Sequence, residues 1–142
     1  MSQIARIEAS LRIDGPAATL KRYFDCENGL GWKLVESGNA RAVNVALALM
    51  PAADTCYGES ITVALSYAMS ANPRLMLGYA DKYPKHFSQW CIPSLFDATD
   101  KEWKAAIDRA ERAIRSVHDQ KLASAKQICL LEIDRARRQA LH

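Results

Sequence analysis

Long hydrophobic runs and low-complexity stretches are both missing from this chain of 142 residues. The longest strongly apolar run, AVNVALALMP at residues 42–51, contains Asn44 and falls far short of the roughly 20 residues that a membrane-spanning helix needs. Hydrophobic residues make up 49% of the chain and charged residues 25%, a balance that excludes a disordered or fibrous protein. We therefore expect one globular domain over residues 1–142, with a hydrophobic core of its own.

Short cysteine spacings are missing as well. Zinc sites, iron–sulfur sites and thioredoxin-like centres use C-x2-C pairs, whereas the four cysteines here are separated by 30, 35 and 38 residues. Two alternatives remain, four buried free thiols or two long-range disulfides in an oxidising compartment. The even number favours disulfides among Cys26, Cys56, Cys91 and Cys129.

The residue patterns of known catalytic sites are not found. The three histidines, His86, His118 and His142, form no H-E-x-x-H motif and no i, i+4 ligand pair. The carboxylates are scattered, and Glu27 and Glu59 would meet only if the helices that carry them stack. We therefore predict no catalytic, cofactor-binding or metal site and no enzyme activity. An unrecognised hydrolase, with a carboxylate pair or a histidine in a cleft, stays open as an alternative.

Apolar residues recur at helical spacing almost everywhere, and the alternation of a β-strand is hard to find. The predicted fold class is all-α: stacked antiparallel helical hairpins, either HEAT-like or an irregular bundle, that end in a long helical hairpin. The first two helices are predicted at residues 3–13 and 16–26. A capping box, TDKE, opens the terminal hairpin over residues 99–140. Residues 92–98 (IPSLFDA) are predicted to form an ordered loop against the body of the protein.

Two stretches share the frame S-x-N-x-R. They are SGNAR at residues 37–41 and SANPR at residues 70–74, and the apolar positions around them match at the same shift of 33 residues. Asn39 and Asn72 are suited to cap the helices that follow, and Pro73 fits a first helical position. The frame indicates two successive helix-turn-helix hairpins stacked side by side, with chance similarity as the alternative.

The net charge of the chain is +3, and the excess of basic residues lies in its second half. Arg135, Arg137 and Arg138 alternate with Glu132 and Asp134 and lack the interleaved aromatics of a nucleic-acid platform. A solvated helix face is the preferred interpretation. The alternative is a cytoplasmic helical adaptor or regulator whose basic last helix meets nucleic acid.

The segment YADKYPKHFSQW at residues 79–90 combines aromatic and basic residues. Loops of this composition make good binding surfaces, although a loop folded onto its own domain would look the same. The residues that we predict to contact a partner are Tyr79, Lys82, Tyr83, Lys85, His86 and Phe87.

The N-terminal sequence MSQIARIEAS shows no signal-peptide pattern. Taken alone, this indicates the cytoplasm. However, a mature protein trimmed of its signal peptide would also begin directly before an amphipathic helix, so the residues leave both compartments open.

Three segments in order carry a resemblance over roughly residues 32–130: GWKLVESGNARAVNVALALMPAADTCYGESITVALSYAMSANPRLML, WCIPS and AERAIRSVHDQKLASAKQICL. This order resembles a group of small secreted or periplasmic all-helical proteins of Gram-negative bacteria, mostly of unassigned function. The resemblance implies that the mature protein works outside the cytoplasm, after removal of a signal peptide, and that Cys91 pairs with Cys129. Cys26 and Cys56 are then left to pair with each other. Each bridge would stabilise the fold by roughly 3 kcal/mol.

Small helical proteins of this kind, without a chemical centre, most often act by binding. In size and helical build the chain is similar to the immunity proteins of type VI secreted cell-wall amidases. We therefore expect a periplasmic inhibitor that occludes a protein partner, such as a secreted toxin or hydrolase. We expect no cofactor, no membrane span and no nucleic acid, and a homo-oligomer is compatible with these features.

Overall fold

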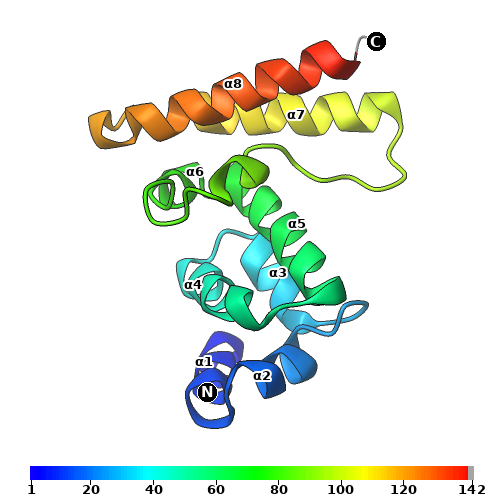
Figure 1. Cartoon of the computed structure of the whole chain (residues 1–142), viewed down its shortest axis with the longest axis vertical. Helices are drawn as coiled ribbons and strands as arrows, with labels where there is room; N and C mark the ends of the chain where they lie inside the picture. The colour runs from blue at the N-terminus through cyan, green and yellow to red at the C-terminus, as the bar shows by residue number, and fades with distance from the viewer. Residues whose placement is uncertain (141–142) are drawn as a thin grey trace.

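The computed structural model describes residues 1–140, and these form eight α-helices, three short 3-10 helices and no β-strand (Figure 1). The predicted all-α class is confirmed. The α-helices are α1 (Gln3–Asp14), α2 (Pro16–Tyr23), α3 (Leu30–Glu36), α4 (Ala40–Leu49), α5 (Thr55–Ala71), α6 (Pro73–Leu77), α7 (Asp100–Arg115) and α8 (Ala123–Ala140). The 3-10 helices are η1 (Met50–Ala52), η2 (Phe87–Trp90) and η3 (Gln120–Leu122).

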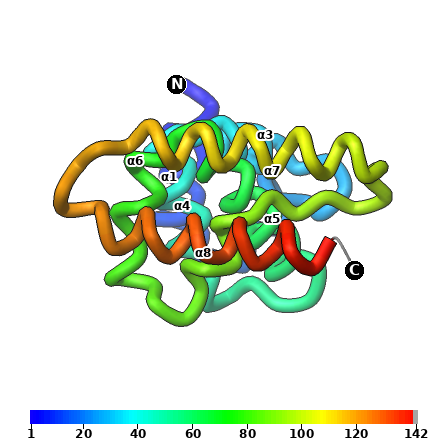
Figure 2. Tube along the Cα trace, turned by 90° about the horizontal axis from the view of Figure 1, so that it is seen from above, coloured from blue at the N-terminus to red at the C-terminus, as the bar shows by residue number. Residues whose placement is uncertain are grey.

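The helices lie in layers along the long axis of the molecule. Helices α1 and α2 form one end, α3 to α6 form the middle, and α7 and α8 cover the other end (Figure 1). Seen from above along that axis, α7 and α8 lie side by side in the layer nearest the viewer (Figure 2). One hydrophobic core runs through all the layers, and its fully buried members include Ile7, Leu49, Leu65, Met76 and Ile107.

The second helix is shorter than predicted. Its predicted range ended at residue 26, whereas α2 ends at Tyr23. The Asp25 side chain provides the physical reason, because its Oδ1 accepts hydrogen bonds from the backbone N–H groups of Glu27 (3.0 Å) and Asn28 (3.3 Å). Local bonds of this kind offer the backbone an alternative to continuing the helix. The chain therefore turns after Phe24 and enters α3 at Leu30.

The turns of the two S-x-N-x-R frames are in direct contact. Asn39 and Asn72 cap α4 and α6 as predicted, accepting from the backbone N–H groups of Ala42 and Leu75. Asn72 also donates its Nδ2–H to the carbonyl oxygen of Gly38 over 2.8 Å. A Cβ atom on Gly38 would lie 2.6 Å from the Cβ of Asn72, and the Gly38 φ angle is +78°. Only glycine therefore fits where the turns meet.

The predicted terminal hairpin is present, and its capping box is confirmed. Thr99 accepts from the backbone N–H of Glu102 through Oγ1, and the Glu102 carboxylate accepts from the backbone N–H of Thr99. At the other end of α7, Lys126 on α8 donates through Nζ to the carbonyl oxygens of Arg115 and Val117. These bonds satisfy carbonyl groups that a helix end leaves without partners.

Both expected cysteine pairs are disulfide bonds. Cys91, just after η2, is bonded to Cys129 on α8, and both residues are fully buried. Cys26, in the connection between α2 and α3, is bonded to Cys56 near the start of α5, where Cys56 is exposed. The Cys91–Cys129 bridge therefore lies in the core, while the Cys26–Cys56 bridge is open to solvent. Among residues 1–140, no helix combines the length and the hydropathy of a membrane span.

Candidate functional site

The segment predicted to contact a partner follows α6 and lies on the left in the views of Figures 1 and 2. Its three polar members, Lys82, Lys85 and His86, are exposed. The two tyrosines are half-buried. Tyr79 donates its hydroxyl hydrogen to Asn44 Oδ1 on α4, and the Tyr83 ring lies 5.8 Å from the Trp90 ring. Much of the aromatic content of this segment is therefore used to attach it to its own domain.

Phe87 corrects the sequence-based prediction. Its side chain is only 2% exposed, and its ring lies 6.3 Å from the ring of Trp90, which is also buried. The prediction that Phe87 contacts a partner is wrong for the folded protein, because the residue is part of the core. Phe87 and Trp90 are three residues apart in η2, a spacing that places both on one side of a 3-10 helix. For Lys82, Lys85 and His86 the contact role stays a prediction.

A second surface stands out by its shape. A groove of about 470 Å³ lies between the α2–α3 connection, α3 and the first turns of α5. Phe96, from the linker between η2 and α7, forms part of its rim. The connection and the linker both lie on the right in Figure 1, so this groove is on the side of the molecule away from residues 79–86. The groove therefore joins three segments that are far apart in the sequence.

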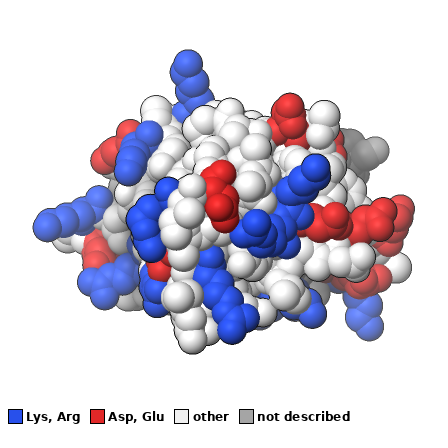
Figure 3. Space-filling view, turned by 90° about the horizontal axis from the view of Figure 1, so that it is seen from below, with Lys and Arg blue, Asp and Glu red and all other residues white. Residues whose placement is uncertain are grey.

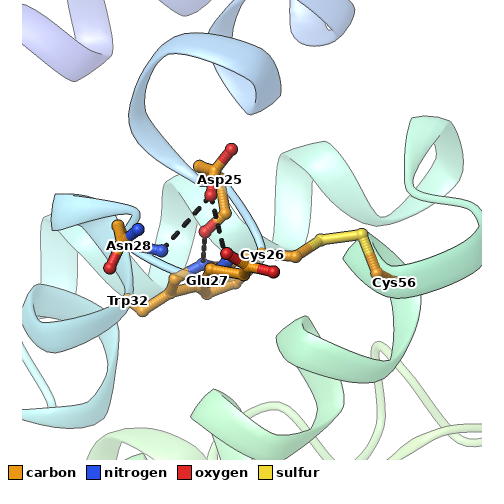
Figure 4. The surroundings of a disulfide bond; sticks show 6 residues. All are labelled: Asp25, Cys26, Glu27, Asn28, Trp32 and Cys56. Carbon is orange, nitrogen blue, oxygen red and sulfur yellow. Dashed lines mark hydrogen bonds between the residues drawn. A yellow bond between two sulfur atoms is a disulfide. The ribbon is translucent and has the colours of Figure 1, made fainter.

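Hydrogen bonds and close packing shape the wall of the groove that precedes α3. The Trp32 indole donates through Nε1 to the carbonyl oxygen of Asp25 over 2.8 Å (Figure 4). The Trp32 ring meets the Phe24 ring edge-on at 4.9 Å. A Cβ atom on Gly31 would lie 2.4 Å from the Phe24 ring, so only glycine allows this approach. The Cys26–Cys56 disulfide then joins this wall to α5, as Figure 4 shows.

The opposite rim is attached to α5 by two hydrogen bonds at Ser94. The Tyr67 hydroxyl donates to the Ser94 carbonyl oxygen over 3.0 Å, and the Ser94 backbone N–H donates to Ser66 Oγ over 3.2 Å. Two residues later, Phe96 is 76% exposed. The linker was predicted to lie against the body, and this holds for the buried Pro93 but not for Phe96. An aromatic ring thus projects from a loop that is anchored close behind it.

The charge of the groove differs in sign from that of the whole chain. Three glutamates line it, Glu27, Glu36 and Glu59, against one basic residue, Lys33, although the chain carries a net charge of +3. Burial raises the pKa of Glu36, and the nearby Lys33 ammonium partly opposes this shift. On the end of the molecule formed by α1 and α2, by contrast, basic and acidic side chains are interspersed (Figure 3). The groove is therefore a locally acidic surface.

Sequence reasoning had reached only part of this site. It named Glu27 and Glu59 as carboxylates that could meet if the helical hairpins stack, and both line the groove. It missed Glu36, Leu30 and Phe96. Of these, Leu30 and Phe96 are large apolar residues in a marked context, because Leu30 lies between Gly29 and Gly31 at the start of α3 and Phe96 precedes Asp97 in the linker before α7. Sequence context of this kind does not say whether the side chain is buried or exposed, so these two residues could be identified only from the structure.

Metal chemistry finds no support in the described part of the chain. Within residues 1–140, no group of three His, Cys, Asp or Glu side chains is placed to hold a metal ion. His86 and His118 are exposed, and His142 lies outside the described residues. What the groove offers is a concave, partly apolar and negatively charged surface. Comparisons of this chain with protein-family models, with curated proteins and with solved structures find no match.

Proposed function

We propose that this chain is an extracytoplasmic binding protein that inhibits a protein partner by covering it, in the manner of the immunity proteins that neutralise secreted cell-wall amidases. The two disulfides support the compartment, because long-range disulfides form and persist outside the reducing cytoplasm. The partner in this proposal is a secreted hydrolase or toxin. The docking surface is the acidic groove and its apolar rim.

The exposure of Phe96 is the observation that carries this proposal. The side chain is 76% exposed, and Leu30, which is 59% exposed, lines the same groove. Fully burying an exposed side chain of this size is favourable by about 1.5–3 kcal/mol before the entropic costs of association are subtracted. Aromatic residues, phenylalanine among them, are enriched in protein interfaces relative to the rest of the surface. The anchoring of the loop at Ser94 limits the conformational entropy that binding would cost.

The experiment is an affinity capture followed by an inhibition assay. The protein, kept oxidised, is immobilised and exposed to a periplasmic extract of its host, and proteins retained through a salt wash are identified by mass spectrometry. The groove variant carries Leu30→Ala and Phe96→Ala. The matched control carries Ile13→Ala and Leu131→Ala, which remove two exposed apolar side chains on α1 and α8, outside the groove.

We expect the wild type and the control to capture one hydrolase in stoichiometric amount and to inhibit its action on peptidoglycan. The groove variant should lose at least tenfold in affinity, since two interface side chains are truncated. Capture without inhibition would contradict the proposal. Equal capture by the groove variant and the control would also contradict it, because the groove would then have no part in binding.

A further inference from the structure

Within residues 1–140, the three glutamates of the groove have no ion-pair partner. Among the residues that the structure describes, eight salt bridges within 4.0 Å engage other carboxylates, and none involves Glu27, Glu36 or Glu59. All three arginines of the basic C-terminal cluster, by contrast, are paired with carboxylates of α7 or α8. The groove therefore brings three carboxylates without an ion pair among the described residues onto one surface, with a single lysine beside them.

Glu36 is the most enclosed of the three glutamates. It lies on α3 and is half-buried, whereas Glu27 and Glu59 are exposed. Its burial raises its pKa, which means that the ionised form has lost hydration without gaining a full counter-charge. The Lys33 ammonium, one turn earlier on the same helix, opposes this only in part. A cation placed in the groove would compensate the Glu36 carboxylate.

Apolar and aromatic groups lie beside these carboxylates. Leu30 and Phe96 are exposed on the rim, and Trp32 and Val63 line the interior. Lysine and arginine side chains pack their methylene stems on apolar surface while their charged ends stay near carboxylates. A guanidinium group also stacks on aromatic faces. The combination of unpaired glutamates and exposed apolar side chains matches a chain segment that alternates basic and apolar residues.

We infer that the groove receives a cationic, partly apolar segment of the protein partner, with a lysine or arginine side chain directed at Glu36 and an apolar side chain against Phe96 and Leu30. This inference rests on the proposed function and adds the chemistry of the partner's segment. Charge complementarity carries it, because the groove is negative in a protein of positive net charge. A free polyamine would satisfy the glutamates but would leave the exposed rim uncovered.

Two capped peptides test the inference without the natural partner. The first is a hexapeptide of alternating arginine and leucine. The second replaces each arginine by citrulline, which keeps the planar shape but carries no charge, because a carbonyl oxygen replaces one NH2 group and leaves three N–H donors in place of five. Binding is followed by NMR on the indole N–H of Trp32, which lies in the groove wall and is assigned by its loss in Trp32→Phe.

The groove variant for this test carries Glu27→Gln, Glu36→Gln and Glu59→Gln. The matched control carries three carboxylate substitutions with the same change in net charge outside this groove: Asp81→Asn, Glu132→Gln and Asp134→Asn. We expect the arginine peptide to shift the Trp32 signal of the wild type and of the control. The groove variant should bind it about tenfold more weakly, which corresponds to about 1.4 kcal/mol spread over three partly solvated charge contacts. Raising the salt concentration should weaken binding to the wild type.

Three results would overturn the inference: equal binding of the citrulline peptide, equal binding to the groove variant and the control, or spermidine binding as strong as that of the arginine peptide and unaffected by Phe96→Ala. The last result would assign the groove to small cations. The peptide experiment tests the chemistry of the bound segment, and the capture experiment tests the proposed function, so a negative result in one does not imply a negative result in the other. Loss of peptide binding with capture intact refutes only the chemistry of the segment, whereas peptide binding without capture and inhibition refutes the proposed function.

Discussion

The clearest test of the fold compares the two asparagines of the repeated S-x-N-x-R frame. Both cap a helix through Oδ1, Asn39 with Ala42 and Asn72 with Leu75. Only Asn72 has a second contact, the hydrogen bond from its Nδ2 to the carbonyl oxygen of Gly38 at 2.8 Å. Replacing each asparagine by aspartate keeps the capping acceptor and removes the amide donor. The pair of substitutions therefore isolates the bond that joins the two turns.

The expected effects differ in size. Asn39→Asp should change the free energy of unfolding by less than about 0.5 kcal/mol, because aspartate and asparagine are equally good caps. Asn72→Asp removes a hydrogen bond worth about 1 kcal/mol and leaves the carbonyl of the buried Gly38 facing a carboxylate, which adds about 1 kcal/mol or more. We therefore expect a loss of about 2 kcal/mol, or roughly 4–8 °C in Tm for a chain of this length.

Urea denaturation of the oxidised protein at pH 7, followed by circular dichroism at a helical wavelength, measures both variants. Asn39→Ala loses the cap and should fall about 1 kcal/mol below Asn39→Asp, whereas Asn72→Ala loses the cap but also removes the carboxylate that faces the Gly38 carbonyl, so it should fall about as far as Asn72→Asp. If the free energies of unfolding of Asn72→Asp and Asn39→Asp agree within about 0.5 kcal/mol, the contact between the two turns does not stabilise the protein. The hydrogen bond between Asn72 and Gly38 would then not stabilise the fold.

Two further predictions concern the groove and its disulfide. Burial raises the folded-state pKa of Glu36 above the ordinary value of 4.5, so its ionised form opposes folding at neutral pH and its protonation at low pH relieves this. Glu36→Gln should therefore raise the free energy of unfolding at pH 7 by a few tenths of a kcal/mol, and the gain should vanish below pH 4; an equal effect at both pH values would contradict the assignment. A mild reductant should reduce Cys26–Cys56 before Cys91–Cys129, because Cys56 is exposed and both Cys91 and Cys129 are fully buried. Alkylation and peptide mapping measure the order, and the reverse order would refute the argument that solvent access decides it.

Local features of the fold could be predicted where a few neighbouring residues decide the structure. Asn39, Asn72 and the Thr99–Glu102 box all cap helices as expected, since a cap depends on atoms within three residues. The end of α2 was misplaced because Asp25 competes with the helix through its own side chain, and helical spacing of apolar residues does not reveal that competition. Helix existence was therefore more predictable than helix boundaries.

Sequence spacing alone could not separate exposed from buried aromatic residues in the irregular segments. Tyr83, Phe87 and Phe96 all lie between regular helices, yet Phe87 is in the core and Phe96 projects into solvent. The difference arises from long-range contacts: η2 packs against α5, whereas the bonds at Ser94 hold the linker so that Phe96 points away. A site built from such residues is visible only once the tertiary contacts are known.

The groove depends on cross-links between distant parts of the chain. The Cys26–Cys56 bond fixes the α2–α3 connection to α5, and the bonds of Tyr67 and Ser66 to Ser94 fix the linker to the same helix. Helix α5 is therefore the common support on which both walls are mounted. Because one of these links is a solvent-accessible disulfide, its reduction would remove the covalent bond between the α2–α3 connection and α5. The bond that fixes one wall of the candidate docking surface is therefore also one of the two disulfides on which the proposed compartment rests.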